Sequence, residues 1–511
     1  MRRDEAQSKF LFGAIAVCLA IAVGVAVMLA TNKWTYAVAG SVAALGTIAA
    51  LASTEAALYT IITIACFDGL IKGMSPGMAS MVLKDAYLGL AMMRWVWEGV
   101  NNQPRQSLSS SVALPAFLFT AYCVGQMFNT ETMSWMLALA GLRSWVIWIP
   151  IYFITYDTIR TRRQFERMLL FIAVISAGTG VYGVIQHQIG FDHLSAVSPN
   201  FGFYDHFRRG SLIRAPGTYV HPGTAGAAMS FAATVCAGVA LASRAFSMQQ
   251  ISLLAAAPIC LTALAATGSR SPLIGGVVGL IVFVAMTRQV RLFVGMAVLV
   301  AIGMGLSERQ AGLAVSQRYT RQLLGMQTVI SRAIGPLYKA GDLLSRFPLG
   351  TGIASGTGVG RSAAILEQPL YVSEDASAFI ENELGRAMKE MGLPGVSLLI
   401  WLLWRAMKSG FVGWKLGTGR DRWLASGLMA GAVNLAVQNM SGSALYLAPG
   451  GIYFWMACAL AARVPDYEAT DREEEVPDRS EEEAAEWDKL ATRSQQRRPL
   501  PPNLPSRRPG A

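Results

Sequence analysis

Long apolar runs alternate with short polar and basic segments over most of the chain. Most runs approach the roughly 20 residues that an α-helix needs to cross the hydrocarbon core of a bilayer. In lipid every backbone polar group must pair within the protein, and the alternation typical of a membrane β-barrel is absent. The pattern predicts an all-α polytopic membrane protein with about 14 transmembrane helices, within a range of about 12–14. The expected spans are about 10–30, 36–53, 56–72, 80–98, 112–128, 135–155, 168–187, 223–243, 251–267, 272–287, 292–306, 395–409, 423–438 and 446–463.

The composition agrees with repeated membrane crossing. Of the 511 residues, 53% are hydrophobic and 15% are charged, whereas a soluble domain carries nearer a quarter charged residues. A net charge of +11 could suit a nucleic-acid-binding protein, but much of the excess lies in short loops, where insertion topology explains it. We therefore expect no nucleic-acid partner. All six cysteines lie in apolar runs and predict no disulfide framework: Cys18, Cys66, Cys123, Cys236, Cys260 and Cys458.

The distribution of lysine and arginine sets the expected orientation. With the N-terminus in the cytoplasm, the most basic connections fall on the cytoplasmic side, as the positive-inside rule requires. Met1–Lys9 and the apolar run after it are then a first membrane helix rather than a cleaved signal peptide. Two long extracytoplasmic loops are expected, 188–222 and 307–394. The basic residues assigned to cytoplasmic connections are Arg160, Arg162, Arg163, Arg167, Arg244, Arg288, Arg291, Arg405, Lys408, Lys415, Arg420 and Arg422.

The chain divides into a membrane domain, 1–463, and a polar tail, 464–511, that is expected in the cytoplasm. The tail places an acidic block, Glu473–Glu486, before a segment rich in arginine and proline. This composition is typical of disorder, so we predict a mostly disordered tail. Docking of a cytoplasmic partner is the alternative to a simple solvated tail, and the solvated tail is favoured.

All four histidines lie in or at the edge of the first long loop, close to Asp192 and Asp205. Their spacing matches no strong zinc or iron motif. We therefore predict no metal site and expect these side chains to form loop surface or to contact a ligand. The four are His187, His193, His206 and His221.

The same loop ends in Arg214-Ala-Pro-Gly217-Thr-Tyr-Val-His221-Pro222, directly before an apolar run. Glycine and proline force an irregular start of the next helix, where free backbone N–H groups can face an anion. Arg208, Arg209 and Arg214 add permanent positive charge, and a guanidinium can donate two parallel hydrogen bonds to a phosphate. For Arg208 and Arg209, contact with lipid headgroups is an equal alternative.

Two more arginines lie near the outer membrane boundary. Arg270 stands in a tight polar turn, Thr267–Pro272, and Arg143 stands in the outer half of the sixth expected span. An arginine at this depth is costly unless it snorkels to the surface or meets a counter-charge. Snorkelling and contact with a phosphate in a cavity both stay open. Lys84 and Asp85, adjacent in the fourth span, are expected to pair with neighbours in a structural role.

The second long loop contains Pro348-Leu-Gly-Thr-Gly352 and, later, a segment with helical spacing that begins at Glu381 and Asn382. Gly392, Pro394 and Gly395 stop this helix before the next span. We expect an amphipathic helix lying across the outer mouth of the bundle. Its apolar stripe consists of Leu384, Met388 and Met391, and its charged side of Glu383, Arg386 and Glu390.

Together these segments resemble the O-antigen ligase and O-antigen polymerase family of bacterial polytopic membrane glycosyltransferases. That family has two outer loops and an arginine-bearing Gly-Thr-x-x-His-Pro segment, here Arg214–Pro222. It also has a Thr-x-Ser-Arg turn, here Thr267–Arg270, and a Pro-Leu-Gly-x-Gly segment, here Pro348–Gly352. The fourth motif of the family is usually His-Asn followed ten residues later by Gly-x-x-Gly. Asn382, Glu390, Gly392 and Gly395 match it here, whereas Glu381 stands where the family commonly has the histidine. The motif-bearing resemblance covers about 214–395.

The resemblance implies extracytoplasmic polymerisation of polyprenyl-diphosphate-linked oligosaccharide repeat units in the bacterial inner (plasma) membrane. It implies an inverting, metal-independent reaction without a cofactor, between a lipid-linked glycan donor and a glycan acceptor. Arg270 and Arg214 are expected to stabilise the diphosphate leaving group, and Glu381 to accept the acceptor's proton or a hydrogen bond from it. The expected substrate-binding residues are Arg143, His221, Arg208, Arg209, Asn382 and Arg386.

Three alternatives stay open. Ligation of a finished glycan onto lipid or protein is the closest, and the missing histidine favours the polymerase only slightly. A transporter or flippase of lipid-linked or anionic solutes predicts mid-bilayer charges in both halves, and apart from Lys84 and Asp85 few are present. A scaffold of an envelope complex would use the tail to dock other polysaccharide-assembly proteins.

Overall fold

The computed structural model describes residues 44–74, 78–101, 105–129, 134–195, 197–209, 212–243, 247–291, 335–355, 382–440 and 442–467, together with 294, 295 and 298. The expected span 10–30, most of the span 292–306 and the tail after Tyr467 therefore lie outside the described residues. Nearly all regular structure in the described part is helical. The exception is an antiparallel pair of two-residue strands, β1 (Arg208–Arg209) and β2 (Leu212–Ile213).

Among the described residues, five helices are long and apolar enough to cross a membrane, and seven if each of two bent helix pairs is one span. The chain is therefore an all-helical protein with the helices of a membrane protein, and the number of about 14 spans stays a prediction. The five are α9 (Arg162–Ile189), α11 (Pro222–Ala242), α12 (Met248–Ala266), α13 (Arg270–Thr287) and α19 (Glu383–Leu416).

The two bent pairs fall within the expected spans 56–72 and 135–155. α3 (Thr54–Cys66) and α4 (Asp68–Met74) meet at 66°, and α7 (Trp135–Val146) and α8 (Ile149–Thr158) meet at 40°. α5 has the length of a span but carries four charged residues, Lys84, Asp85, Arg94 and Glu98. The other described elements are α5 (Met78–Asn101), η1 (Gln106–Ser109), α6 (Ala113–Gln126), α10 (Asp192–Ser195), η2 (Pro199–Phe207), α17 (Gly335–Arg346), α20 (Gly419–Gln438) and α21 (Gly450–Ala462).

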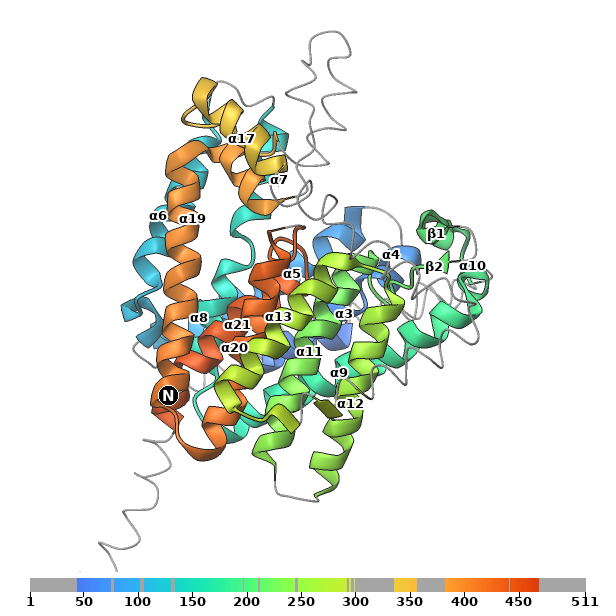
Figure 1. Ribbon diagram of the computed structural model, residues 1–511. Coiled ribbons are helices and arrows are strands. Elements are labelled where there is room, and N and C mark those ends of the chain that lie inside the picture. Colours follow the sequence, from blue (N-terminus) through green and yellow to red (C-terminus); the bar gives the residue numbers. More distant parts are fainter. Residues whose placement is uncertain are drawn as a thin grey trace, which may run out of the picture.

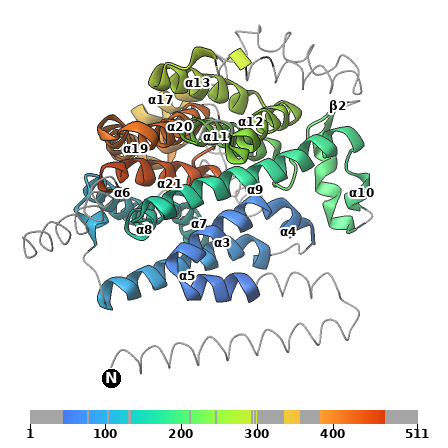
Figure 2. The same ribbon diagram turned by 90° about the horizontal axis from the view of Figure 1, so that it is seen from below.

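α11 forms the centre of the bundle. Figure 2 shows it enclosed by α9, α12, α13 and α20, and nearly all of its residues are buried. Its sequence is rich in alanine and glycine, and small side chains let helix backbones approach closely. At the crossing with α20, a Cβ on Gly238 would lie 2.9 Å from the Gly427 Cα. Small residues at this crossing therefore set how closely α11 and α20 pack.

The long α19 packs along α6 and α21 and bends where the sequence predicts a stop. Gly392 has φ +64° and ψ −164°, so the helical path is interrupted there and then continues to Leu416. α17 lies across the upper part of α19 in Figure 1. The helix before Gly392 and the span after it are therefore two helices joined by a sharp kink, at the position where the sequence predicts that the first helix stops.

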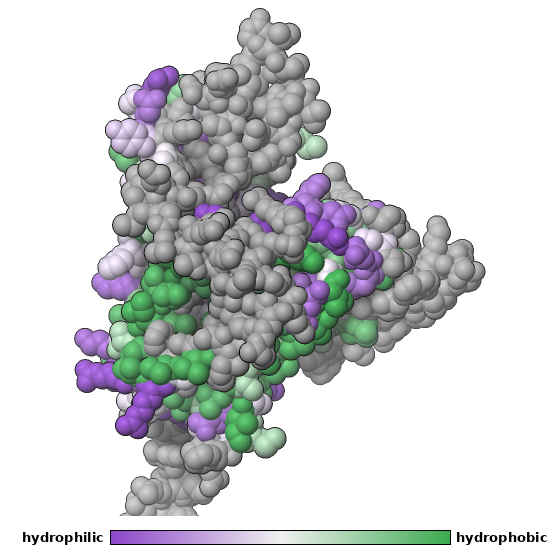
Figure 3. Space-filling model, turned by 45° about the vertical axis from the view of Figure 1, so that its right-hand side comes forward, coloured by the Kyte–Doolittle hydropathy of each residue, from purple (hydrophilic) through white to green (hydrophobic). Residues whose placement is uncertain are grey.

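Most of the loops discussed below lie at one end of the bundle. We call it the loop end. The described connections there are 190–195, 197–209, 212–221, 267–269, 439–440 and 442–449, towards the top of Figure 1. At the opposite end, residues 159–161 and 417–418 connect helices, and Arg162 and Arg420 form ion pairs of 3.0 Å with Asp421 and Glu166. Figure 3 shows a band of apolar side chains with hydrophilic side chains beyond it on both sides. This distribution suits a bundle with a lipid-facing girdle.

The glycine contact between α11 and α20 generates a stability prediction. Gly238→Val places side-chain atoms against Gly427 and the Trp423 carbonyl, so the helices must separate. We expect a loss of about 1–3 kcal/mol, measured as a lower thermal unfolding midpoint in detergent. Gly178→Val, on an exposed part of α9 with nothing within 4 Å, is the matched control. Equal losses in the two variants would contradict the packing argument.

Candidate functional site

The Arg214 loop lies directly on the turn between α12 and α13. Arg214 Nη2 donates to Ser269 Oγ at 3.0 Å, and its Nε donates to the Thr267 carbonyl at 3.4 Å. Gly268, with φ +58°, permits this approach, because a Cβ there would lie 3.3 Å from the Arg214 Cγ. Arg270 is half-buried and begins α13 directly after the turn. Two segments far apart in the sequence thus place Arg214 against the residues that precede Arg270.

His221 caps the first turn of α11 at the end of the same loop. Its Nδ1 accepts a hydrogen bond from the Gly223 N–H at 3.0 Å, and its ring makes an edge contact with Phe207 at 5.1 Å between centroids. Desolvation and, after it, the positive charge of Arg214 lower the pKa of His221, although the residue as a whole is exposed. The capping bond agrees with that direction, because it requires an unprotonated Nδ1. His221 is therefore a helix cap first.

The loop is anchored in the break between α3 and α4. The Thr218 carbonyl accepts the Gly69 N–H at 2.9 Å, and the Thr218 hydroxyl donates to the Cys66 carbonyl at 2.5 Å. Tyr204, from η2, donates to the Tyr219 carbonyl at 2.9 Å. A broken helix leaves backbone groups without intrahelical partners. The Arg214 loop supplies those partners and is itself fixed by them.

Charged side chains gather beside this break. Lys84 Nζ lies 2.7 Å from the Asp68 carboxylate, which also pairs with Lys72 at 3.2 Å. The next residue, Asp85, forms a two-pronged pair with Arg143, in which Nε and Nη2 both donate, the latter at 3.0 Å. The expected partners of Lys84 and Asp85 are thereby identified. Arg143 meets a protein carboxylate, and about half of its side chain stays exposed.

The segment Pro348–Gly352 lies against the bend in α19. The Thr351 N–H donates to the Lys389 carbonyl at 2.8 Å, and the Leu393 N–H donates to the Pro348 carbonyl at 3.0 Å. Gly350 (φ +89°) and Gly392 (φ +64°) face each other, and a Cβ on Gly392 would lie 2.2 Å from the Pro348 oxygen. Both positions therefore require glycine. The third and fourth motifs of the sequence form one unit.

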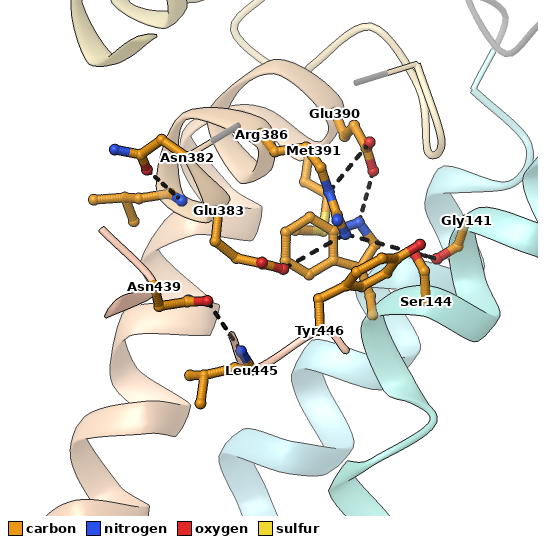
Figure 4. Close-up of polar contacts among 12 residues, drawn as sticks. Gly141, Ser144, Asn382, Glu383, Arg386, Glu390, Met391, Asn439, Leu445 and Tyr446 are labelled. Atoms are coloured by element: carbon orange, nitrogen blue, oxygen red, sulfur yellow. Dashed lines mark hydrogen bonds and ion pairs between the residues drawn. The ribbon is translucent and has the colours of Figure 1, made fainter. Parts of the chain in front are cut away.

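Arg386 is the centre of the cluster in Figure 4. Its side chain is 3% exposed and lies 3.6 Å from Glu383 and 3.5 Å from Glu390. The guanidinium is stacked between two rings, 3.9 Å from the centroid of Trp145 and 4.1 Å from that of Tyr446. The charged side of the expected amphipathic helix is therefore buried and does not face water. Arg386 joins α19 to α7 and to the connection between α20 and α21.

The carboxylates of this cluster are held unequally. Glu390 is fully buried and accepts the Trp145 Nε1–H at 2.6 Å. Glu383 is also buried, and its Oε2 has no hydrogen-bond partner in the described part of the chain. A buried arginine flanked by two carboxylates is paired and neutralised, which favours a structural role for Arg386 over direct contact with a phosphate.

Asn382 caps α19, and its neighbour Glu381 lies outside the described residues. The Asn382 Oδ1 accepts the N–H groups of Leu384 and Gly385 at 2.9 and 3.1 Å, and its Nδ2 donates to the Met440 carbonyl at 2.5 Å. These bonds account for the asparagine as a structural cap. The expected roles of Glu381 as base and of Asn382 in substrate binding stay predictions.

Arg208 and Arg209 are the remaining basic residues of the first loop. Arg208 is exposed and pairs with Asp192 at 2.5 Å and with Asp205 at 3.6 Å. Arg209 pairs with Leu212 in the short strand ladder, and its side chain is not described. Arg208 therefore belongs to the loop's own ion-pair network.

The histidines of the loop contact its own structure. His187 Nδ1 lies 2.7 Å from the Ile213 carbonyl, and His193 Nε2 lies 3.0 Å from the Tyr182 hydroxyl. His206 is exposed. Within the described ranges, no three His, Cys, Asp or Glu side chains lie close enough to hold a metal ion.

The site contains residues that the sequence did not single out, chiefly Trp145, Tyr446 and Asp68. The spacing of Glu383, Arg386 and Glu390 could have predicted their ion pairs, because side chains three and four residues apart meet on a helix. Trp145 and Tyr446 carry no comparable signal. Comparison of the chain with protein-family models and with curated proteins gives no match.

The Arg386 cluster predicts a non-additive effect of mutation. Arg386→Leu alone removes the guanidinium that balances the buried Glu383 and Glu390 carboxylates, at a cost of about 3–5 kcal/mol. Arg386→Leu combined with Glu383→Gln and Glu390→Gln should cost less, because no buried charge is left uncompensated. Thermal unfolding of the purified proteins measures both. Arg346→Leu, at an exposed pair with Asp342, should change little. A triple variant less stable than the single one would refute the pairing argument.

Proposed function

We propose that this protein polymerises polyprenyl-diphosphate-linked oligosaccharide repeat units on the outer side of a bacterial plasma membrane. One observation carries the proposal: four short motifs, scattered over residues 214–395, meet in two pairs at the loop end. Arg214 lies on the Thr267–Arg270 turn, and Pro348–Gly352 lies on the α19 bend. Weak motifs that converge in space are better evidence for a shared site than the same motifs in sequence.

The proposed orientation puts the loop end outside and the opposite end in the cytoplasm. Arg160, Arg162, Arg163 and Arg167 follow α8 at the opposite end, and Arg420 and Arg422 begin α20 there. Such clusters belong on the cytoplasmic side of a plasma membrane protein. The proposal includes about 14 spans, with both termini and the polar tail in the cytoplasm.

The proposed chemistry is a displacement at the anomeric carbon of the donor sugar. The acceptor hydroxyl oxygen forms the new bond as the bond to the diphosphate oxygen breaks, and the electron pair leaves with the diphosphate. Arg214 and Arg270 provide fixed positive charge for the departing group, which needs no reorganisation during the reaction. Glu381 takes the proton of the acceptor hydroxyl.

The geometry ranks the proposed substrate contacts. Arg214 donates to a carbonyl and a hydroxyl of the Thr267–Arg270 turn, which puts it beside the start of α13, where Arg270 lies. Arg143 is engaged by Asp85, and Arg386 by two carboxylates. We therefore assign the diphosphate to Arg214 and Arg270, with Arg143 contributing if its pair with Asp85 opens.

Arg214→Ala and Arg270→Ala should each reduce formation of long-chain product by about 10²–10³-fold, since each removes a charge that stabilises the leaving group. Polysaccharide length on a gel measures the product, and a membrane blot confirms that the protein is present. Arg420→Ala, at the opposite end of the bundle and paired with Glu166, is the control and should keep the normal chain length. Normal chains in both loop-end variants would remove the proposed role.

Glu381→Gln tests the proton acceptor separately. The variant should make less product than the wild type. Product formation by the wild type should also fall as the assay pH falls towards the pKa of an ordinary carboxyl, because a protonated base cannot accept a proton, and the variant should lack this pH dependence. Full activity of Glu381→Gln would exclude the base.

Deletion of the gene distinguishes a polymerase from a ligase. Single repeat units accumulate if the protein is a polymerase, and unattached long chains accumulate if it is a ligase.

A further inference from the structure

A cavity of about 240 Å³ lies at the opposite end of the bundle from the proposed glycan site. Its wall is built from the start of α3, the last turns of α5 and the first turn of α9. Arg105, directly before η1, and the end of α8 with the loop that follows it complete the wall. On α5, Glu98 in this wall follows Lys84 by fourteen positions, which is roughly 21 Å along the helix. The cavity and the loop-end site are therefore separate.

The carboxylates in the cavity wall are all matched by donors from the protein. Glu98 accepts from Thr54 at 2.7 Å and from Arg94 at 2.8 Å. Asp157 accepts from the Ser107 hydroxyl and N–H, at 2.6 and 3.0 Å, and from Trp95 Nε1 at 3.1 Å. Glu55 accepts from Gln164 at 2.8 Å and from Tyr59 at 3.2 Å, and lies 3.5 Å from Arg167. None of the three needs a cation from outside.

The two guanidinium groups of the wall, unlike its carboxylates, are not matched by charged partners among the described residues. In the described part of the chain, neither Arg105 nor Arg160 has a carboxylate oxygen within ion-pair distance, and Arg160 Nε donates to the neutral Asp157 carbonyl at 2.6 Å. The Arg105 guanidinium lies 3.6 Å above the Trp95 ring. Gly99 makes room for it, because a Cβ there would lie 2.0 Å from its Nε. The group is thus placed by packing rather than by a counter-charge.

The surroundings of Arg105 oppose its charge. Burial lowers the pKa of Arg105, the nearby Asp157 and Glu98 raise it, and the like charge of Arg160 lowers it again. The wall itself holds two guanidinium groups and three carboxylates. Arg94 and Arg167, from outside the wall, pair with Glu98 and Glu55, which leaves Arg105 and Arg160 against Asp157. A bound anion would restore neutrality and relieve the repulsion between Arg105 and Arg160.

Size and place narrow the ligand further. The volume is below the usual range for drug-sized ligands, so a single compact group fits. Trp97 and Val100, exposed apolar residues of the same α5 turns, put the cavity at the edge of the lipid-facing surface. We propose that this cavity binds a phosphate group through Arg105 and Arg160, carried either by an anionic lipid headgroup or by a free phosphate.

The test uses the full-length protein with two probes. Inorganic phosphate is titrated in detergent at constant ionic strength against chloride, and the thermal unfolding midpoint is followed. Retention of phosphatidic acid, relative to phosphatidylcholine, is measured by native mass spectrometry. We expect saturable binding of at least one probe, weakened about tenfold or more in Arg105→Gln and in Arg160→Gln, since each removes charge-assisted hydrogen bonds.

Arg405→Gln is the matched control. Arg405 also donates to a backbone carbonyl, that of Ser111 at 3.1 Å, and it lies outside the cavity wall at the same end of the bundle. It should bind both probes like the wild type. Binding of phosphatidic acid alone assigns the phosphate to a lipid headgroup, and binding of inorganic phosphate assigns it to a free phosphate.

No saturable response of the wild type to either probe would overturn the proposal. Equal weakening in Arg405→Gln and the two cavity variants would do the same, since it would reflect net charge alone. If Arg105→Gln is not monodisperse, Arg160→Gln carries the test from the other wall, and unchanged binding there refutes the site. The outcome is independent of the glycan chemistry, because neither variant touches the loop-end residues.

Discussion

A charge inside a helical bundle needs the protein to supply the partner that water would supply outside. Arg386 shows how far this constraint organises the structure. Its two carboxylates come from its own helix, whereas the rings that stack on it come from Trp145 on α7 and from Tyr446 between α20 and α21. The guanidinium therefore holds α19, α7 and the α20–α21 connection together at the loop end. Lys84 and Asp68 repeat the arrangement at the α3–α4 break.

The same requirement applies to the backbone. Where α3 ends and α4 begins, carbonyl and N–H groups lose their helical partners, and Thr218 accepts and donates in their place. At the α19 bend, Gly350 and Gly392 allow the segment Pro348–Gly352 to lie against α19 and to exchange backbone hydrogen bonds with it. The loop that contains Thr218 and the segment Pro348–Gly352 are thus each held by hydrogen bonds to an interruption in a helix. The proposed catalytic arginines lie on such fixed segments, which suits a site that must be preorganised.

The two ends of the bundle carry different electrostatic arrangements. At the loop end, Arg143 and Arg386 are balanced by carboxylates, and Arg214 lies on the turn that precedes Arg270. At the opposite end, Arg105 and Arg160 face a cavity without an ion pair in the described residues. The two proposals concern opposite ends of the bundle and different residues, so either can hold without the other.

Hydropathy and helix-breaking residues act locally. The sequence alone therefore predicted an all-helical chain with apolar, membrane-type helices, and the positions of most of the described helices. Gly392 and Pro394 marked the α19 bend, the spacing of Glu383, Arg386 and Glu390 contained their ion pairs, and four motifs named the segments that meet. The partners of the charged side chains depend on the packing of distant segments. A hydropathy average cannot tell a charged side chain that faces a neighbouring helix from one that faces water. Only packing showed that Arg386 is enclosed and that Arg143 meets Asp85, since those partners come from distant segments.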